Sequence, residues 1–217
     1  MKRNKGIGTM LLLGFALSLW GQEEEKWYFE LTTGWNDTGD ETLNLNENER
    51  VQSAEAAFDP GFAAGGALGY RFSPKFRLEA EMMYRTSDLD EVSFPQSGTL
   101  DEGDYASLAL AGNLFYDVNL FGSEKARSFI GIGPVWLQEV DVDLTSNGLE
   151  QSYSGDEVGF QVLAGVNYRL GPRWDLSFEA RFLDMGGITM DGEENATGQV
   201  TADYAPVSAM ASIGFRF

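Results

Sequence analysis

The chain has 217 residues, of which 34 are acidic and 15 are Lys or Arg, and it contains neither His nor Cys. Without these two residue types it cannot carry a Ser-His-Asp triad, a Cys-His pair, a disulfide or a metal site built on His or Cys ligands. A formal net charge of −19 argues against nucleic acid as a partner, because nucleic-acid binding requires a basic surface. The length is that of one domain or a small pair of domains.

The N-terminus has the pattern of a secretory signal peptide. Lys2, Arg3 and Lys5 precede the apolar segment Met10–Trp20, which is about as long as a signal-peptide core and roughly half as long as a membrane-spanning helix. The sequence becomes polar after Gly21. We therefore expect residues 1–21 to be a signal peptide and residues 22–217 to form the mature domain.

Apolar residues alternate with other residues along eight segments of the mature chain. In the first segment Trp27, Phe29 and Leu31 share one side, whereas Tyr28 and Glu30 share the other. This alternation of period two is typical of a β-strand with one apolar face. The eight predicted strands cover residues 26–35, 62–72, 76–84, 106–116, 130–136, 158–170, 174–182 and 207–217.

Short and long connections alternate between these predicted strands. Three turns lie near residues 73–75, 119–123 and 171–173, and four longer segments cover residues 36–59, 86–104, 138–156 and 184–203. Transmembrane barrels have short turns at one end and long loops at the other. We therefore predict an all-β fold, an eight-stranded antiparallel up-and-down transmembrane β-barrel with four long extracellular loops and three short periplasmic turns.

The residues opposite the apolar faces fit the interior of such a barrel. In residues 61–69 they are all glycine or alanine, and small side chains suit the crowded lumen of eight strands. Charged residues on the same faces are expected to pair inside, because each would cost several kcal/mol if it faced lipid. The predicted lumen network consists of Glu30, Arg71, Arg77, Glu79, Glu81, Arg85, Arg169, Asp175, Glu179, Arg181 and Arg216.

An internal repeat places two pairs of these residues, Arg71 with Arg169 and Glu81 with Glu179, in equivalent positions. Residues 70–84 and 168–182 share the pattern Tyr-Arg-apolar-x-Pro-basic-aromatic-x-Leu-x-x-Glu, in which Glu81 corresponds to Glu179. The two segments are separated by half of the mature chain. We expect them to form hairpins on opposite sides of the barrel.

Charge is divided between the two ends of the predicted barrel. The four long connections hold 23 of the 34 acidic residues and one basic residue, Arg50, whereas the short turns are basic. Loose binding of divalent cations is one reading of the acidic loops, and a solvated repulsive surface is the other. The segment Asp141–Glu150 lacks the Gly at position 6 and the Glu at position 12 of an EF-hand. No metal site of defined geometry and no cofactor is expected.

These features resemble the small outer-membrane β-barrel family typified by OmpA and OmpX, including the Opa-like surface proteins. The resemblance covers residues 26–217 and includes the glycine-rich segments 129–133 and 163–170. It implies the outer membrane of a diderm bacterium, with membrane lipid and lipopolysaccharide as partners. It also implies that the barrel-assembly machinery reads the alternating apolar residues Ile213, Phe215 and Phe217 as an assembly signal.

The resemblance does not determine an activity, because fold and function are separable. Enzymes of this size class in the outer membrane rely on a His base, so no enzymatic activity is expected. The leading hypothesis is a structural or surface-interaction barrel, because eight strands leave little lumen. One alternative is a narrow porin-like channel for ions or small solutes, gated by the lumen charges. The other is a soluble lipocalin-like barrel, which would place the apolar faces inside and the charged faces outside.

Overall fold

The computed structural model describes residues 25–39, 41–47, 50–94, 98–100, 102–123, 125–146, 149–193 and 198–217. The predicted signal peptide, residues 1–21, lies outside these described residues. No helix in the described part of the chain is long and apolar enough to span a membrane. The strands are β1 (Trp27–Asp37), β2 (Glu41–Glu47), β3 (Arg50–Phe58), β4 (Gly61–Arg71), β5 (Phe76–Phe94), β6 (Gly98–Leu100), β7 (Glu102–Val118), β8 (Ala126–Ser146), β9 (Leu149–Arg169), β10 (Trp174–Asp184), β11 (Gly187–Glu193), β12 (Gln199–Asp203) and β13 (Val207–Arg216).

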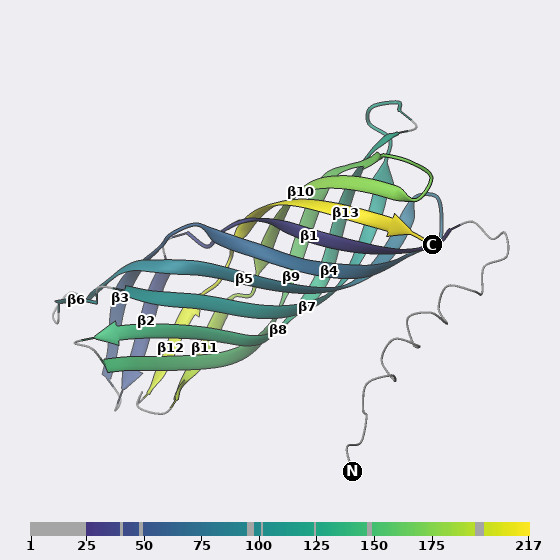
Figure 1. The fold of residues 1–217 in the computed structure, drawn as a ribbon. Helices are drawn as coiled ribbons and strands as arrows, with labels where there is room; N and C mark the ends of the chain where they lie inside the picture. Colours follow the sequence, from purple (N-terminus) through teal and green to yellow (C-terminus); the bar gives the residue numbers. More distant parts are fainter. Residues whose placement is uncertain are drawn as a thin grey trace, which may run out of the picture.

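Eight of these strands close into an antiparallel barrel, which confirms the predicted fold class (Figure 1). The order around this main barrel is β1, β4, β5, β7, β8, β9, β10 and β13, and β13 pairs with β1 to close the ring. On β1, Leu31 lies opposite Ile213 of β13 on one side and opposite Gly66 of β4 on the other. The three short turns and the C-terminus lie together at one end, which we call the short-turn end.

The long connections lie at the opposite end, and the structure adds strands within them that the sequence analysis did not assign. There β3 pairs with β5, β2 with β3, β12 with β2, β11 with β12, and β11 with β9. Together with the outer parts of β5, β7, β8 and β9 these strands form a second closed ring (Figure 1). We call this ring the extension. The barrel therefore continues well past the strands that the alternation pattern predicted.

The outward side chains of the main barrel are apolar and exposed. Leu31 is 54% exposed, Met82 55%, Ile130 57% and Phe178 57%. Charged and polar neighbours on the same strands are buried inside the barrel. This polarity is the reverse of that expected for a soluble lipocalin-like barrel, and it is the one expected for strands surrounded by lipid.

Aromatic side chains meet across strands near the short-turn end. Such rings are typical of the boundary between the hydrocarbon core and the headgroups. Each contact joins outward residues of neighbouring strands or of one hairpin, with ring centroids 4.8–6.0 Å apart. The contacts are Trp27–Tyr70, Phe72–Phe76, Phe76–Tyr116 and Trp174–Phe215.

Inward glycines make room for large lumen side chains. A Cβ atom on Gly69 would lie 2.0 Å from the ring of Tyr28, and one on Gly131 would lie 2.5 Å from the ring of Phe115. Both rings are buried. The small residues that the sequence places on inward faces therefore let bulky groups fill the lumen.

The extension has an apolar interior. Residues from its loop-derived strands and from the outer parts of β7, β8 and β9 form one buried cluster. Its members include Leu43, Ala54, Tyr105, Leu137, Val140, Tyr153, Ile188, Met190 and Val200. On the outside of the same strands, Thr189 and Asp191 are exposed. The extension thus has the polarity of a water-soluble barrel.

Candidate functional site in the barrel lumen

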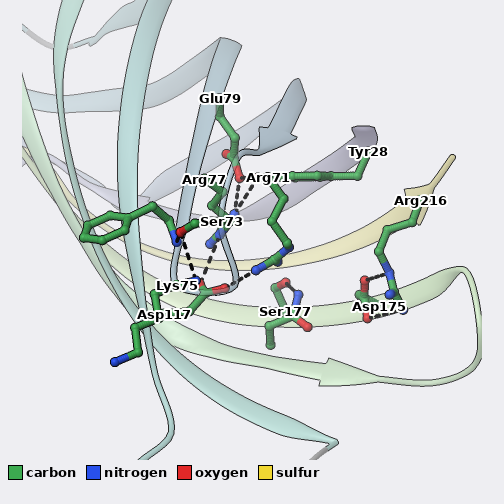
Figure 2. Close-up of polar contacts among 12 residues, drawn as sticks. Tyr28, Arg71, Ser73, Lys75, Arg77, Glu79, Asp117, Asp175, Ser177 and Arg216 are labelled. Atoms are coloured by element: carbon green, nitrogen blue, oxygen red, sulfur yellow. Dashed lines mark hydrogen bonds and ion pairs between the residues drawn. The ribbon is translucent and has the colours of Figure 1, made fainter. Parts of the chain in front are cut away.

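The part of the lumen nearest the short-turn end is occupied by an ion-pair cluster (Figure 2). Asp117 of β7 accepts hydrogen bonds from two arginines: a short one from Nη1 of Arg71 and one of 3.3 Å from Nε of Arg77. Arg77 also forms a close ion pair with Glu79 and donates from Nη1 to the Tyr28 hydroxyl at 2.9 Å. Tyr28 in turn donates a short hydrogen bond to Glu79. The cluster joins side chains from four strands.

Arg77 also stacks on aromatic rings inside the lumen. Its guanidinium carbon lies 3.8 Å from the ring centroid of Phe115 and 4.7 Å from that of Phe129, so the cation stacks against both rings. These two rings meet edge to face and pack with Leu163. Arg77 is 5% exposed and Phe115 is 1% exposed. A cation and two aromatic rings therefore pack together inside the barrel at this level.

Arg216 and Asp175 form a separate pair at the short-turn end (Figure 2). Nε of Arg216 lies 2.7 Å from Oδ2 of Asp175, and Nη2 donates to Oδ1 at 3.3 Å. Nη2 also donates to the backbone carbonyl of Gly171 at 3.3 Å. This pair ties the last strand, β13, to β10 and to the turn that precedes it.

The middle of the lumen is built around Arg181. Its guanidinium lies 2.7 Å from Glu81 through Nη1 and 2.5 Å from Glu179 through Nη2. Gln161 donates to Glu81 at 3.4 Å and to Asn113 at 2.9 Å, which extends the network to β9 and β7. The two glutamates occupy equivalent positions of the internal repeat, so the repeat brings both carboxylates to one guanidinium.

Glu30 and Arg85 are buried in the lumen without an ion pair among the described residues. Glu30 is 7% exposed. Arg85 is 2% exposed, and its Nε and Nη1 atoms have no hydrogen-bond partner in the described part of the chain. Arg85 lies where the polar lumen meets the apolar interior of the extension, near Tyr105 and Tyr204. Among the described residues, the network thus ends at a buried cation with no ion pair.

Two groups of predicted residues lie at the rim or on the outer surface. Arg169, at the end of β9, is exposed and forms no ion pair with a described residue. Ile213 is outward and 44% exposed, and Phe215 packs against Trp174 with ring centroids 5.0 Å apart. Phe217 donates from its backbone nitrogen to the carbonyl of Trp27 at 2.8 Å. Recognition of Ile213, Phe215 and Phe217 by the assembly machinery stays a prediction.

The lumen arrangement can hold charge, but among the described residues it presents no pair of free carboxylates for acid–base chemistry. Glu79, Glu81 and Glu179 are each bound to an arginine. Among the described residues no three potential metal ligands gather. Asn147 and Gly148, in the segment compared with an EF-hand, lie outside the described residues. Loose cation binding by the acidic connections stays a prediction.

The sequence analysis missed several partners of the network. Tyr28, Asn113, Asp117 and Gln161 all contribute hydrogen bonds, and Phe115 supplies the ring beneath Arg77. A signal was available for three of them. Asn113, Phe115 and Asp117 occupy alternate positions on the inward face of β7, opposite the apolar positions used to identify that strand. The predicted network contained only charged residues and none from β7, so these three residues were left out.

Comparisons with known proteins agree with this geometry. A family model described as "Outer membrane protein beta-barrel domain" matches residues 7–213. A protein of Gluconacetobacter diazotrophicus described as "Outer membrane protein" is 30% identical over 148 residues, which cover 64% of this chain and 39% of that relative. The match therefore spans less than half the length of the relative.

Two solved structures share the fold. OprG from Pseudomonas aeruginosa superposes with a TM-score of 0.66 and 18% identity, covering 90% of this chain and 98% of OprG. Neisserial surface protein A superposes with a TM-score of 0.51 and 14% identity, covering 88% of this chain and 97% of that protein. At these identities the likeness shows a common barrel fold and does not transfer an activity.

Proposed function

Because the chain belongs to the outer membrane protein β-barrel domain family, we propose that it is a non-conducting barrel with a structural or surface-interaction role. Its location in the outer membrane follows from the family and from the apolar exterior of the main barrel. In the proposed orientation the short-turn end faces the periplasm and the extension faces the outside of the cell.

The observation that carries the proposal is the filled lumen. Arg77 and Phe115 occupy the lumen near the short-turn end, and Arg181 with its two glutamates occupies the middle. Above them, the described side chains inside the extension form a buried apolar cluster. Ion passage would require breaking buried ion pairs, and breaking one such pair costs about 3–5 kcal/mol.

The ion pairs also support a structural role. Arg77 connects β5 with β7, and Arg181 of β10 connects to Glu81 of β5 across the lumen. These links join strands that are not all neighbours in the ring. A barrel braced across its interior resists deformation by the surrounding membrane, which is what a passive outer-membrane component requires.

The outward faces set the partners that we propose. Membrane lipid surrounds the main barrel, and the acidic outer surface of the extension meets lipopolysaccharide, with divalent cations between its carboxylates and the lipid phosphates. Lipopolysaccharide binding should then fall when a chelator such as EDTA removes these cations, and binding that survives chelation would exclude the bridge.

We propose no enzymatic activity, since the sequence contains neither His nor Cys and the lumen glutamates near the arginines are paired.

The test is single-channel recording in planar lipid bilayers on barrels shown to be folded by their heat-modifiable mobility. The wild type and the matched variant Arg173→Ala, which removes a rim arginine paired with Glu25, should give no discrete current. Discrete wild-type currents that change with Arg181→Ala and not with Arg173→Ala would contradict the proposal. That result would establish the narrow channel instead.

A further inference from the structure

At the short-turn end of the lumen, a small cavity is surrounded by more cations than its carboxylates can balance. The cavity measures about 20 Å³, which is about the space that one water-sized group occupies. Six of its nine lining residues are Arg or Lys and two are Asp, which leaves a net charge of +4 when all are ionised, or +3 when Glu79, the partner of Arg77, is included. The remaining lining residue is Asn167.

Both carboxylates of the cavity already have partners. Asp117 is bound by Arg71 and Arg77, and Asp175 is bound by Arg216 (Figure 2). Two further guanidinium groups, those of Arg127 and Arg169, have no side-chain hydrogen bond or ion pair within the described part of the chain. They project from β8 and β9, which are adjacent strands of the barrel.

Arg127 and Arg169 lie close enough to other cations to repel them. Arg169 interacts unfavourably with Arg216, Arg127 and Arg71, and favourably with Asp175. Like charges held together in this way destabilise the protein unless a counter-ion is present. Burial of the site is partial, since Arg71 has a side-chain exposure of 29% and Arg169 is exposed, so a solute has access from the short-turn end.

We propose that this cavity binds a phosphate group, with one oxygen in the cavity and the others held by Arg127 and Arg169 at its rim. Guanidinium groups match the geometry of phosphate oxygens and form charge-assisted hydrogen bonds with them. The small volume limits the buried part of the ligand to one oxygen. The phosphate comes either from a lipid headgroup of the inner leaflet or from a soluble phosphate. This proposal does not depend on whether the lumen conducts.

The experiment follows the arginine side-chain Nε–Hε signals of the folded barrel by nuclear magnetic resonance. Inorganic phosphate is added at constant ionic strength to protein in a zwitterionic detergent without phosphate groups. In a second arm the barrel is placed in vesicles of a phosphate-free lipid, digalactosyldiacylglycerol, with and without phosphatidic acid. We expect the signals of Arg127 and Arg169 to shift in at least one arm. A response to inorganic phosphate alone identifies a soluble ligand, and one to phosphatidic acid identifies a headgroup.

Three variants complete the test. Arg127→Gln and Arg169→Gln should each weaken the binding that is observed by about tenfold or more, the usual effect of losing a charged hydrogen bond. Arg173→Gln removes the same charge from the same end of the barrel but does not line the cavity, so it should leave binding unchanged. Shifts in neither arm would overturn the proposal. Equal weakening by all three variants would also overturn it, because it would indicate general attraction to a basic rim.

Discussion

The main barrel and the extension are two closed rings that share β5, β7, β8 and β9, yet their interior and exterior polarities are opposite. Inside the main barrel lie Arg77 and Arg181, and its outer surface is apolar. Inside the extension lie Leu137 and Ile188, and Asp191 is exposed on its outer surface. Hydrogen-bonded strands can thus continue from lipid into water when the two faces exchange their polarity.

A single strand shows where this exchange occurs. On β9, Val158 and Phe160 are exposed on the outer surface at 64% and 46%. Two residues earlier, Asp156 is exposed on the same side of the strand. On the inner side of β9, the buried residue is the polar Gln161 in the main barrel and the aromatic Tyr153 in the extension. The change from Val158 to Asp156 therefore marks the expected edge of the hydrocarbon region.

The largest expected effect comes from breaking the ion-pair network of the main barrel. Arg181→Met leaves Glu81 and Glu179 buried without their cation, and removing one partner of a buried pair costs about 3–5 kcal/mol. Urea unfolding in lipid vesicles measures the loss of unfolding free energy. A loss well below 1 kcal/mol would show that the polar interior contributes little to the main barrel.

A matched pair of lysine substitutions tests the outer surfaces of the two rings. Met82→Lys places a charge on the exposed outer face of the main barrel and should cost about 2–4 kcal/mol near the bilayer centre. Thr189→Lys makes the same change on the exposed outer face of the extension and should change stability by less than about 0.5 kcal/mol. Similar costs in vesicles would remove the distinction between the surfaces.

Two glycine substitutions test how fully the main barrel is packed. Gly69→Ala forces a methyl group against the Tyr28 ring and should destabilise the barrel by about 1–3 kcal/mol. Gly112→Ala adds the same methyl group on the exposed outer side of β7, where nothing lies within 4 Å. Its effect should be within about 0.5 kcal/mol. Equal unfolding free energies for both variants would indicate a loose lumen.

The smallest effect is expected at the junction of the two rings. Arg85 is buried, and its Nε and Nη1 atoms have no hydrogen-bond partner in the described part of the chain, so Arg85→Met removes a desolvated charge and keeps most of the side-chain volume. We expect the variant to be as stable as the wild type or more stable by about 1 kcal/mol. A marked destabilisation would show that Arg85 holds an interaction comparable to those of Arg181.

Much of the main barrel could be predicted from the sequence, for a physical reason. Lipid requires an uninterrupted apolar face, so strands such as β10 (Trp174–Asp184) carry a clear alternation. The predicted strand at 174–182 differs from β10 by two residues at its end. The charged inward positions followed from the same alternation, because residues of one parity share one face.

The extension could not be predicted in the same way. Its strands β2, β11 and β12 have only five to seven residues, and water on the outer side imposes no continuous apolar face. The signal consists of short alternations such as Ile188 and Met190 among polar neighbours. The many acidic residues of the long connections were a stronger signal than these short alternations, so the sequence indicated loops there.

The ion-pair partner of each lumen residue also could not be predicted from the sequence. Alternation indicates that Arg71 and Asp117 both point inward, but they lie on β4 and β7, which are separated by β5 in the ring. Which inward residues meet across a lumen depends on the tilt and stagger of the strands. The sequence therefore predicts the set of lumen charges and not their pairs.

The exchange of polarity can be measured most directly with spin labels, because the chain has no native cysteine. Single cysteines at Leu78, Thr189 and Met190 would carry labels on the outer face of the main barrel, the outer face of the extension and the interior of the extension. In vesicles, Leu78→Cys should be accessible to oxygen, Thr189→Cys to a water-soluble nickel complex, and Met190→Cys to neither. A label at Thr189→Cys that responds to oxygen as strongly as Leu78→Cys, and not to nickel, would contradict the account.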